Sequence, residues 1–175
     1  MQGPYSPGMD AFLAVVSKRE VRRYDARPLD EDSTRRILEA GRVAGSAGNR
    51  QRRRFVVLSD RDGAADAVYE PGNLRGAALV VAIVVAGKGP LGFDAGRAAQ
   101  NMMLAAWNEG IGSCPNGVSD PDRMREVVGH APDEQVATLL SFGYPERSRN
   151  PEGRSAEEWI SRADRRPFHE IVERR

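Results

Sequence analysis

The segment Leu79–Ala86 reads LVVAIVVA, an uninterrupted apolar run that is rich in β-branched residues. A run of this kind is typical of a strand that is buried on both faces in the middle of a sheet. The surrounding apolar stretch, 77–86, is too short to span a bilayer as a helix. The chain is therefore expected to fold around a central strand at this place.

The order of the other elements predicts an α/β (α+β) fold. Asp30 or Asp32 is placed to cap the second helix. The expected helices cover 9–17, a stretch ending near Ala44, 61–69, 93–109, 120–128 and a segment from 156. The expected strands cover 55–58, 79–86, a short stretch after 110–114, and 136–142. This order favours a three-layer sandwich in which one mixed sheet is flanked by helices.

Composition sets the outer limits of the interpretation. The 175 residues are enough for one domain with a core, and the net charge of +1 gives no global field for nucleic acid or a membrane. Cys114 is the only cysteine, which excludes an intrachain disulfide, and the two histidines form no zinc motif. Residues 1–8 lack the cationic start and apolar run of a signal peptide, so a cytoplasmic protein is expected.

Two polar stretches carry the functional hypothesis. The segment 18–25 places four cations within six residues, and Arg and Lys side chains are the usual ligands of phosphate. Taken alone, such a run is more often a solvated turn. The second stretch, 44–51, is rich in Gly, Ser, Asn and Gln and precedes the strand expected at 55–58. Together the two stretches favour a site for an anionic ligand that forms hydrogen bonds.

These stretches resemble the FMN-dependent nitroreductase family. Its members carry an Arg-Arg-Ser-x-Arg-x-Phe run after the first helix and Ala-Pro-Ser-x-x-Asn-x-Gln-Pro-Trp-x-Phe after the second. The matching residues here are Lys18, Arg19, Arg22 and Tyr24 in the first run and Ala44, Ser46, Asn49, Gln51 and Phe55 in the second. Further similar segments follow in the family's order, at 98–106, 110–114, 139–145 and 165–167.

The resemblance implies a nitroreductase-like domain over residues 1–175, with an extension at 146–175 that embraces a partner subunit. It also implies a set of FMN-binding residues. Lys18, Arg19, Arg22 and Arg165 would hold the phosphate; Gly45, Ser46, Ala47, Asn49 and Gln51 would lie beside the ring; Pro115, Asn116 and Gly117 would face the flavin N5. The plainer interpretations are a solvated tail charge for Arg165 and an ordinary turn at 116–117.

The activity implied by the resemblance is a ping-pong transfer of electrons. NADH or NADPH would reduce the flavin, and a small organic acceptor such as a nitroaromatic or a quinone would reoxidise it. Family members are homodimers with flavin sites at the interface, to which the 44–51 loop of the neighbouring subunit contributes. No side chain is identified as a proton donor, and no metal, nucleic acid or membrane partner is expected.

Departures from the family pattern leave alternatives open. Glu20 replaces the usual Ser, Gly45 the first Pro, Arg52 the second Pro and Arg53 the Trp. A flavin- or deazaflavin-binding protein without nitroreductase turnover is one alternative, and an enzyme that uses a deazaflavin is another. The two added arginines predict a substrate mouth that prefers anionic acceptors or NADPH. The Gly-x-Gly-x-x-Gly loop at 87–92 is a weaker signal, for a dinucleotide-binding unit.

Overall fold

The computed structural model describes residues 9–175, so the interpretation of residues 1–8 lies outside the described part. The chain forms two compact units. The larger unit contains residues 19–149, and the smaller contains 150–175 together with 9–18. The boundary at Asn150 lies four residues after the start of the predicted extension.

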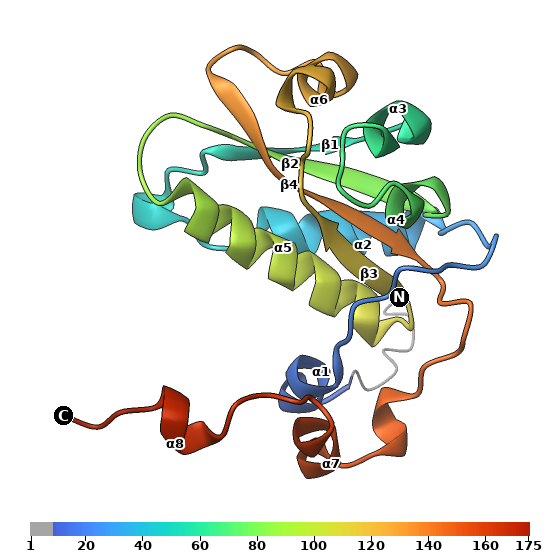
Figure 1. Ribbon diagram of the computed structural model, residues 1–175, viewed down its shortest axis with the longest axis vertical. Helices are drawn as coiled ribbons and strands as arrows, with labels where there is room; N and C mark the ends of the chain where they lie inside the picture. Colours follow the sequence, from blue (N-terminus) through green and yellow to red (C-terminus); the bar gives the residue numbers. More distant parts are fainter. Residues whose placement is uncertain (1–8) are drawn as a thin grey trace, which may run out of the picture. The chain divides into compact units, whose positions relative to one another are not determined.

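The larger unit is built on a four-stranded sheet with the order β1-β2-β4-β3 (Figure 1). The strands are β1 (Arg53–Val57), β2 (Leu79–Ala86), β3 (Gly112–Asn116) and β4 (Glu134–Gly143). β2 pairs with a strand on each side, which confirms the predicted central strand and its bounds. The sheet was expected to be mixed, but all three pairs of these strands are antiparallel. Parallel pairing occurs at the bridge between Glu20 and Ser113.

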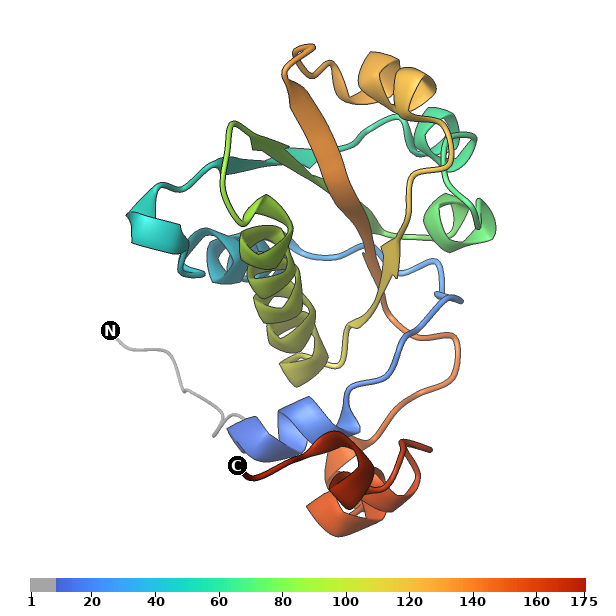
Figure 2. The same ribbon diagram turned by 60° about the vertical axis from the view of Figure 1, so that its left-hand side comes forward.

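Helices cover both faces of the sheet (Figures 1 and 2). Along β2, Val81 and its alternate neighbours face α2 (Glu31–Arg42) and α5 (Leu91–Asn108). The residues between them, such as Ala82, face the other side. That side is covered by α3 (Arg61–Ala65), α4 (Gly72–Arg75) and α6 (Pro121–Val128). The period of two in a continuously apolar strand thus produces two hydrophobic cores and three layers.

Side-chain caps fix the starts of two helices. Asp30 begins α2 by accepting the Ser33 N–H at 2.7 Å, so Asp30 rather than Asp32 is the cap. Asp120 begins α6 by accepting the Arg123 N–H at 3.0 Å. Each carboxylate satisfies a backbone donor that has no partner within its own helix.

The helix predicted over 61–69 is shorter than expected. It ends at Ala65, because the residues that follow pair with the chain beyond β3 instead. Val68 forms a bridge with Val118, and the Tyr69 N–H donates to the Gly117 carbonyl at 3.3 Å. The separate short helix α4, over Gly72–Arg75, was not predicted. Tertiary pairing here overrides the local helical preference.

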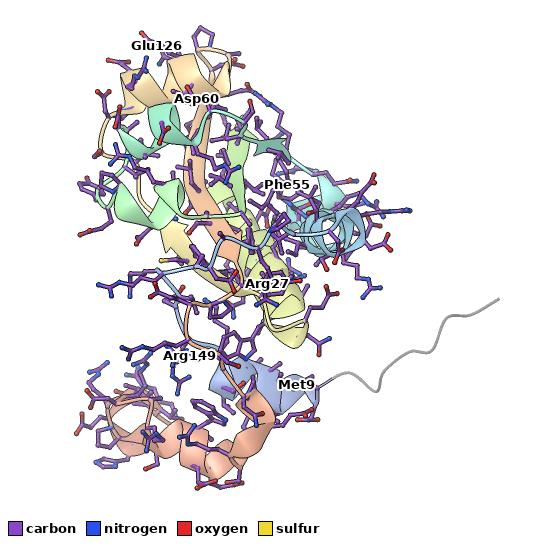
Figure 3. The ribbon with its side chains drawn as sticks, turned by 90° about the vertical axis from the view of Figure 1, so that its right-hand side faces the viewer. Met9, Arg27, Phe55, Asp60, Glu126 and Arg149 are labelled. Carbon is purple, nitrogen blue, oxygen red and sulfur yellow. The ribbon has the colours of Figure 1, made fainter. Side chains whose placement is uncertain are left out.

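The layer of α2 and α5 packs closely at a glycine. A Cβ at Gly41 would lie 2.7 Å from Met102 Sδ of α5 and 3.0 Å from Phe55 Cζ of β1. Figure 3 shows Phe55 on the side of the sheet that carries α2. Only glycine permits this approach, which places the end of α2 against both α5 and the start of β1.

The smaller unit contains α1 (Ala11–Ser17), a 3₁₀ turn (Pro151–Gly153), α7 (Ala156–Ser161) and α8 (Phe168–Ile171). The helices expected at 9–17 and from 156 are confirmed, whereas α8 was not predicted. Trp159 is buried, and its indole N–H donates to the Pro151 carbonyl at 2.8 Å. Across residues 9–175, no helix combines the length and the apolar character needed to cross a membrane.

Candidate functional site

The basic segment lies along the outer edge of β3. The Val21 N–H donates to the Ser113 carbonyl at 3.0 Å, and Glu20 forms the parallel bridge to the same residue. Val21 is buried, and its neighbours Glu20 and Arg22 are exposed, as alternation in an extended segment requires. Arg19 is half-buried. The structure therefore places Arg19 and Arg22 beside the strand that carries Pro115 and Asn116.

The end of β3 presents two of its three predicted residues to solvent. Pro115 and Gly117 are exposed, whereas Asn116 is buried. The Asn116 side chain accepts a hydrogen bond from Asn73 Nδ2 at 3.0 Å and donates to the Cys114 carbonyl at 2.9 Å. Asn73 comes from α4, so the Asn116 amide faces that layer and braces the strand. Asn73 was missed, because no sequence pattern links two residues 43 positions apart.

A buried network joins this strand end to the basic segment. Ser141 of β4 donates to the Cys114 carbonyl at 3.2 Å, and its hydroxyl lies 3.0 Å from the Tyr24 hydroxyl. Tyr24 in turn donates to the Val21 carbonyl at 2.6 Å. Burial raises the pKa of Tyr24 well above its usual value, so the phenol stays neutral. The network fixes the basic segment against the sheet without adding charge.

The polar loop 44–51 has an unusual backbone. It contains a 3₁₀ turn, Ala47–Asn49, in which Gly48 has φ 56°; Asn49 and Gln51 have φ 52° and 51°. Positive φ is uncommon for residues other than glycine. The Gln51 N–H donates to Ser46 Oγ at 2.9 Å, and the Ala47 N–H donates to the Asp94 carboxylate of α5. Gly45, Asn49 and Gln51 are exposed, and Ser46 and Ala47 are half-buried.

Contacts within the protein occupy the arginines that follow this loop. The Arg53 guanidinium donates to the Ala44 carbonyl and lies 3.5 Å from the carbonyl oxygens of Gly41 and Gly45, which closes the C-terminal end of α2. Arg52 donates to the Lys88 carbonyl. These contacts give Arg53 a structural role within its own chain, and the charged substrate mouth at Arg52 and Arg53 stays a prediction.

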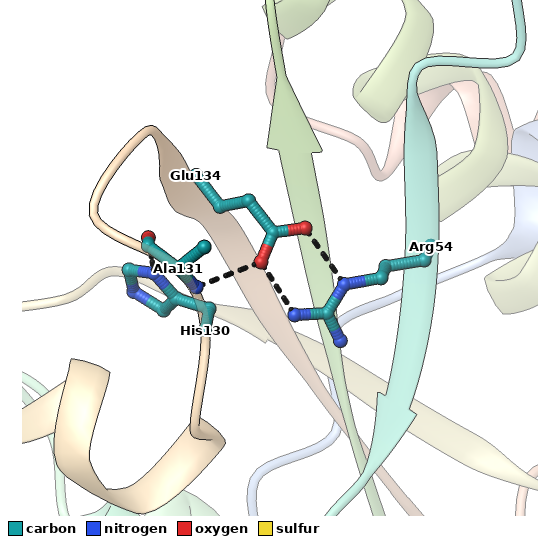
Figure 4. A network of polar contacts seen from close by, with 4 residues as sticks. All are labelled: Arg54, His130, Ala131 and Glu134. Carbon is teal, nitrogen blue, oxygen red and sulfur yellow. Dashed lines mark hydrogen bonds and ion pairs between the residues drawn. The ribbon is translucent and has the colours of Figure 1, made fainter.

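The third arginine, Arg54, ties β1 to β4, the two strands on either side of β2 (Figure 4). It forms a bidentate ion pair with Glu134 of β4, at 2.9 and 2.7 Å, and the Ala131 N–H donates to the same carboxylate at 2.9 Å. These bonds lower the pKa of Glu134 to about 2, with the Arg54 hydrogen bonds as the largest cause. The pair is a brace between strands rather than a binding group.

The two groups of predicted residues lie at opposite edges of the sheet. Pro115 pairs with Leu140, Leu140 with Val81, and Val81 with Val57, so this row crosses all four strands. Loop 44–51 lies beyond the other end of β1. With strands about 4.8 Å apart and a rise of about 3.4 Å per residue, the groups are on the order of 20 Å apart. Figures 1 and 2 show that the segment before β1 and β3 lie apart from one another.

The remaining candidates belong to the smaller unit. Lys18 is the C-terminal cap of α1, and its backbone N–H donates to the Ala14 carbonyl. Arg165 is exposed, and its guanidinium donates to the carbonyl of Ala163. Both stay predicted phosphate ligands.

The Gly87–Gly92 loop does not form a dinucleotide-binding unit. It joins β2 to α5, but α5 continues into β3, which is not a neighbour of β2. A dinucleotide-binding βαβ unit requires parallel strands, whereas β2 is antiparallel to both of its neighbours. The loop is a surface connection with positive φ at Gly87 and Gly89.

A hollow of about 550 Å³ lies along one side of α2. It contains none of the predicted site residues. Its lining consists of Asp32, Arg35, Arg36, Glu39, Ala40 and Val43.

The chain is similar to known proteins in sequence and in fold. A family model described as the nitroreductase family matches residues 15–86 and 91–144. A protein of Archaeoglobus fulgidus that carries a provisional NADH dehydrogenase/NAD(P)H nitroreductase name is 29% identical over 149 residues, 78% of this chain and 86% of that protein. A Bacteroides thetaiotaomicron structure with the same provisional name has a TM-score of 0.80 at 22% identity and covers 94% of this chain and 98% of its own. A structure described as an FMN-dependent nitroreductase from Clostridium difficile has a TM-score of 0.71 at 21% identity, covering 86% and 96%.

Proposed function

Because this chain belongs to the nitroreductase family of oxidoreductases, we propose that it binds FMN and passes electrons from NADH or NADPH to a small organic acceptor. A similar archaeal protein carries a provisional NAD(P)H nitroreductase name, and a similar fold is described as FMN-dependent. The name and the description belong to those two proteins, and their similarity to this chain supports the proposal. The acceptor class proposed is a nitroaromatic, a quinone or a similar compound, used in alternation with the nicotinamide.

The residues present fit such a cofactor in their chemistry. Arg22 is an exposed cation beside β3 and suits a phosphate ester, with Arg19, Lys18 and Arg165 as further cations. Pro115 and Gly117 are exposed at the end of β3, where main-chain groups would meet a flat ring. Bound FMN would supply acceptance and donation of hydride equivalents, and the protein would supply position and field.

The single observation that carries the proposal is the placement of the two groups of residues at opposite edges of one sheet. In one chain these groups are on the order of 20 Å apart, which is at or beyond the reach of a single flavin. A second copy that brings its loop 44–51 to the β3 edge of the first would complete the site. We therefore propose a homodimer with two flavin sites at its interface, with 146–175 contributing to the contact between subunits.

The absorbance spectrum of the purified protein, together with consumption of NADH or NADPH, tests this function. A yellow protein that oxidises either nucleotide when given a quinone or a nitroaromatic is the expected result. The double variant Lys18→Ala/Arg22→Ala should lose bound flavin; an unchanged flavin content would contradict the phosphate assignment. Yellow protein that never oxidises a nicotinamide would instead indicate a flavin-binding protein, and a colourless protein that takes up a deazaflavin would indicate the third alternative.

A further inference from the structure

We propose that Asp94 is a positioning residue, which sets the conformation of loop 44–51 and so prepares this loop to contact the ligand. This inference rests on the proposed function, because it concerns the loop that would lie beside the flavin ring. Asp94 is not among the residues that the sequence pointed to. It lies on a different element from the loop, in the first turn of the 18-residue helix α5.

Asp94 joins α5 to the loop through a hydrogen bond, and this contact is called the clamp below. Its side chain is buried, with a relative exposure of 8%, and its two carboxylate oxygens lie 3.2 and 3.1 Å from the Ala47 nitrogen. A buried carboxylate is unfavourable unless it is hydrogen-bonded or paired with a cation. Within residues 9–175, no ion pair to Asp94 is formed. The Ala47 N–H and the positive end of the α5 dipole are therefore what offsets its charge.

The loop needs a constraint of this kind. Gly48, Asn49 and Gln51 all have positive φ, and two of these three residues carry a side chain. Such conformations persist only where the surrounding structure holds them. The bond from the Gln51 N–H to Ser46 is internal to the loop, and Arg53 holds only its beginning. The bond to Asp94 is the one that attaches the turn Ala47–Asn49 to the body of the sandwich.

A second residue of α5 acts beside it. The Arg97 guanidinium, three positions after Asp94, lies next to Gly45. The first two turns of α5 thus approach the loop at two points, at Gly45 through the Arg97 side chain and at Ala47 through a hydrogen bond.

Removal of the carboxylate should release the turn without removing any group that touches the ligand. A released turn must be ordered again on binding, so affinity falls even though every contact residue is present. Asp94→Asn keeps one oxygen that can accept the Ala47 N–H. This conservative variant should therefore preserve the hydrogen bond that Asp94→Ala removes. Asp120→Ala is the control, because it removes an aspartate that accepts a backbone N–H at the start of another helix, α6, away from the loop.

Two measurements on the full chain test the clamp. Amide hydrogen exchange reports the Ala47 N–H directly in flavin-free protein. Titration of FMN into the same protein, followed by quenching of its fluorescence, reports affinity. We expect Asp94→Ala to accelerate exchange at Ala47 at least tenfold and to weaken FMN binding about tenfold. Asp94→Asn should show an exchange rate at Ala47 and an FMN affinity close to those of the parent protein. Asp120→Ala should change neither the exchange rate nor the affinity.

The possible results distinguish a failure of the inference about Asp94 from a failure of the proposed function. Unchanged exchange at Ala47 in Asp94→Ala, or unchanged FMN affinity despite faster exchange, overturns the inference. An equal loss in the Asp120→Ala control shows a general effect of stability and overturns it as well. If the parent protein binds no FMN, the proposed function fails, and exchange at Ala47 alone then decides whether the clamp exists. If Asp94→Ala does not fold, the comparison of Asp94→Asn with the parent protein decides in the same way.

Discussion

Arg53 illustrates how a residue that departs from a family pattern finds a structural use. Its guanidinium donates to the Ala44 carbonyl and lies close to those of Gly41 and Gly45, where α2 ends. We expect Arg53→Ala to lower the free energy of unfolding by about 1–3 kcal/mol, the usual value of hydrogen bonds to a charged group. Arg53→Lys should not restore it, because an ammonium lacks the guanidinium fork. Urea denaturation measures both; a change as small as that of the exposed Arg52→Ala would contradict the capping role.

Glu20 is the other departure at residue scale. Its backbone pairs with Ser113, and its exposed side chain alternates with the buried Val21. A carboxylate that pointed at a phosphate would oppose it by about 4 kcal/mol at 4 Å and an effective dielectric of 20. We expect Glu20→Ser to leave FMN affinity within about tenfold of the parent, because we expect the carboxylate to turn toward neighbouring cations. A much larger gain, measured by fluorescence titration, would show that Glu20 opposes the phosphate, and a much larger loss that it organises the arginines.

At the scale of elements, the pattern of apolar residues decided most of the fold. The bounds of β2 were predicted correctly, because a strand buried on both faces needs no partner to be recognised. The end of α3 was not predicted correctly, because Val68 forms a bridge with Val118, which lies 50 positions later in the sequence. The same limit applies to Asn73 and Asp94, whose partners are distant in sequence. Loop 44–51 was recognised through its composition, but its strained backbone was not.

The ion pair between Arg54 of β1 and Glu134 of β4 should make the free energy of unfolding depend on pH. The folded protein lowers the pKa of Glu134 from 4.5 to about 2. A lowered carboxyl pKa contributes stability that is present above pH 4.5 and is lost as the pH falls toward 2. The difference in the free energy of unfolding between the parent and Glu134→Gln should therefore be largest near pH 6 and should shrink between pH 4.5 and 2.

Urea denaturation across this range of pH measures the difference. Glu126→Gln is the matched control, because Glu126 pairs at 2.9 Å with Arg123 on the exposed side of α6. Exposed pairs of this kind contribute little, so the control should change stability only slightly. A Glu134→Gln effect that is constant from pH 7 to pH 3 would contradict the assigned pKa.

At the scale of the whole molecule, one chain keeps the two groups of predicted site residues apart. Arg19, Arg22, Pro115 and Gly117 lie at the β3 edge, and loop 44–51 lies beyond the far end of β1. The central claim is that a complete flavin site forms only when two copies supply these halves to one another. An FMN that bound at either half alone would lack either the cations or the polar loop.

Analytical ultracentrifugation of the flavin-loaded protein tests this claim most directly. Sedimentation is followed at a protein wavelength and at a flavin wavelength across a dilution series. We expect flavin absorbance to sediment with the dimer, at two flavins per dimer, and we expect a dilution that releases monomers to release free flavin as well. A stable monomer that retains FMN would contradict the claim.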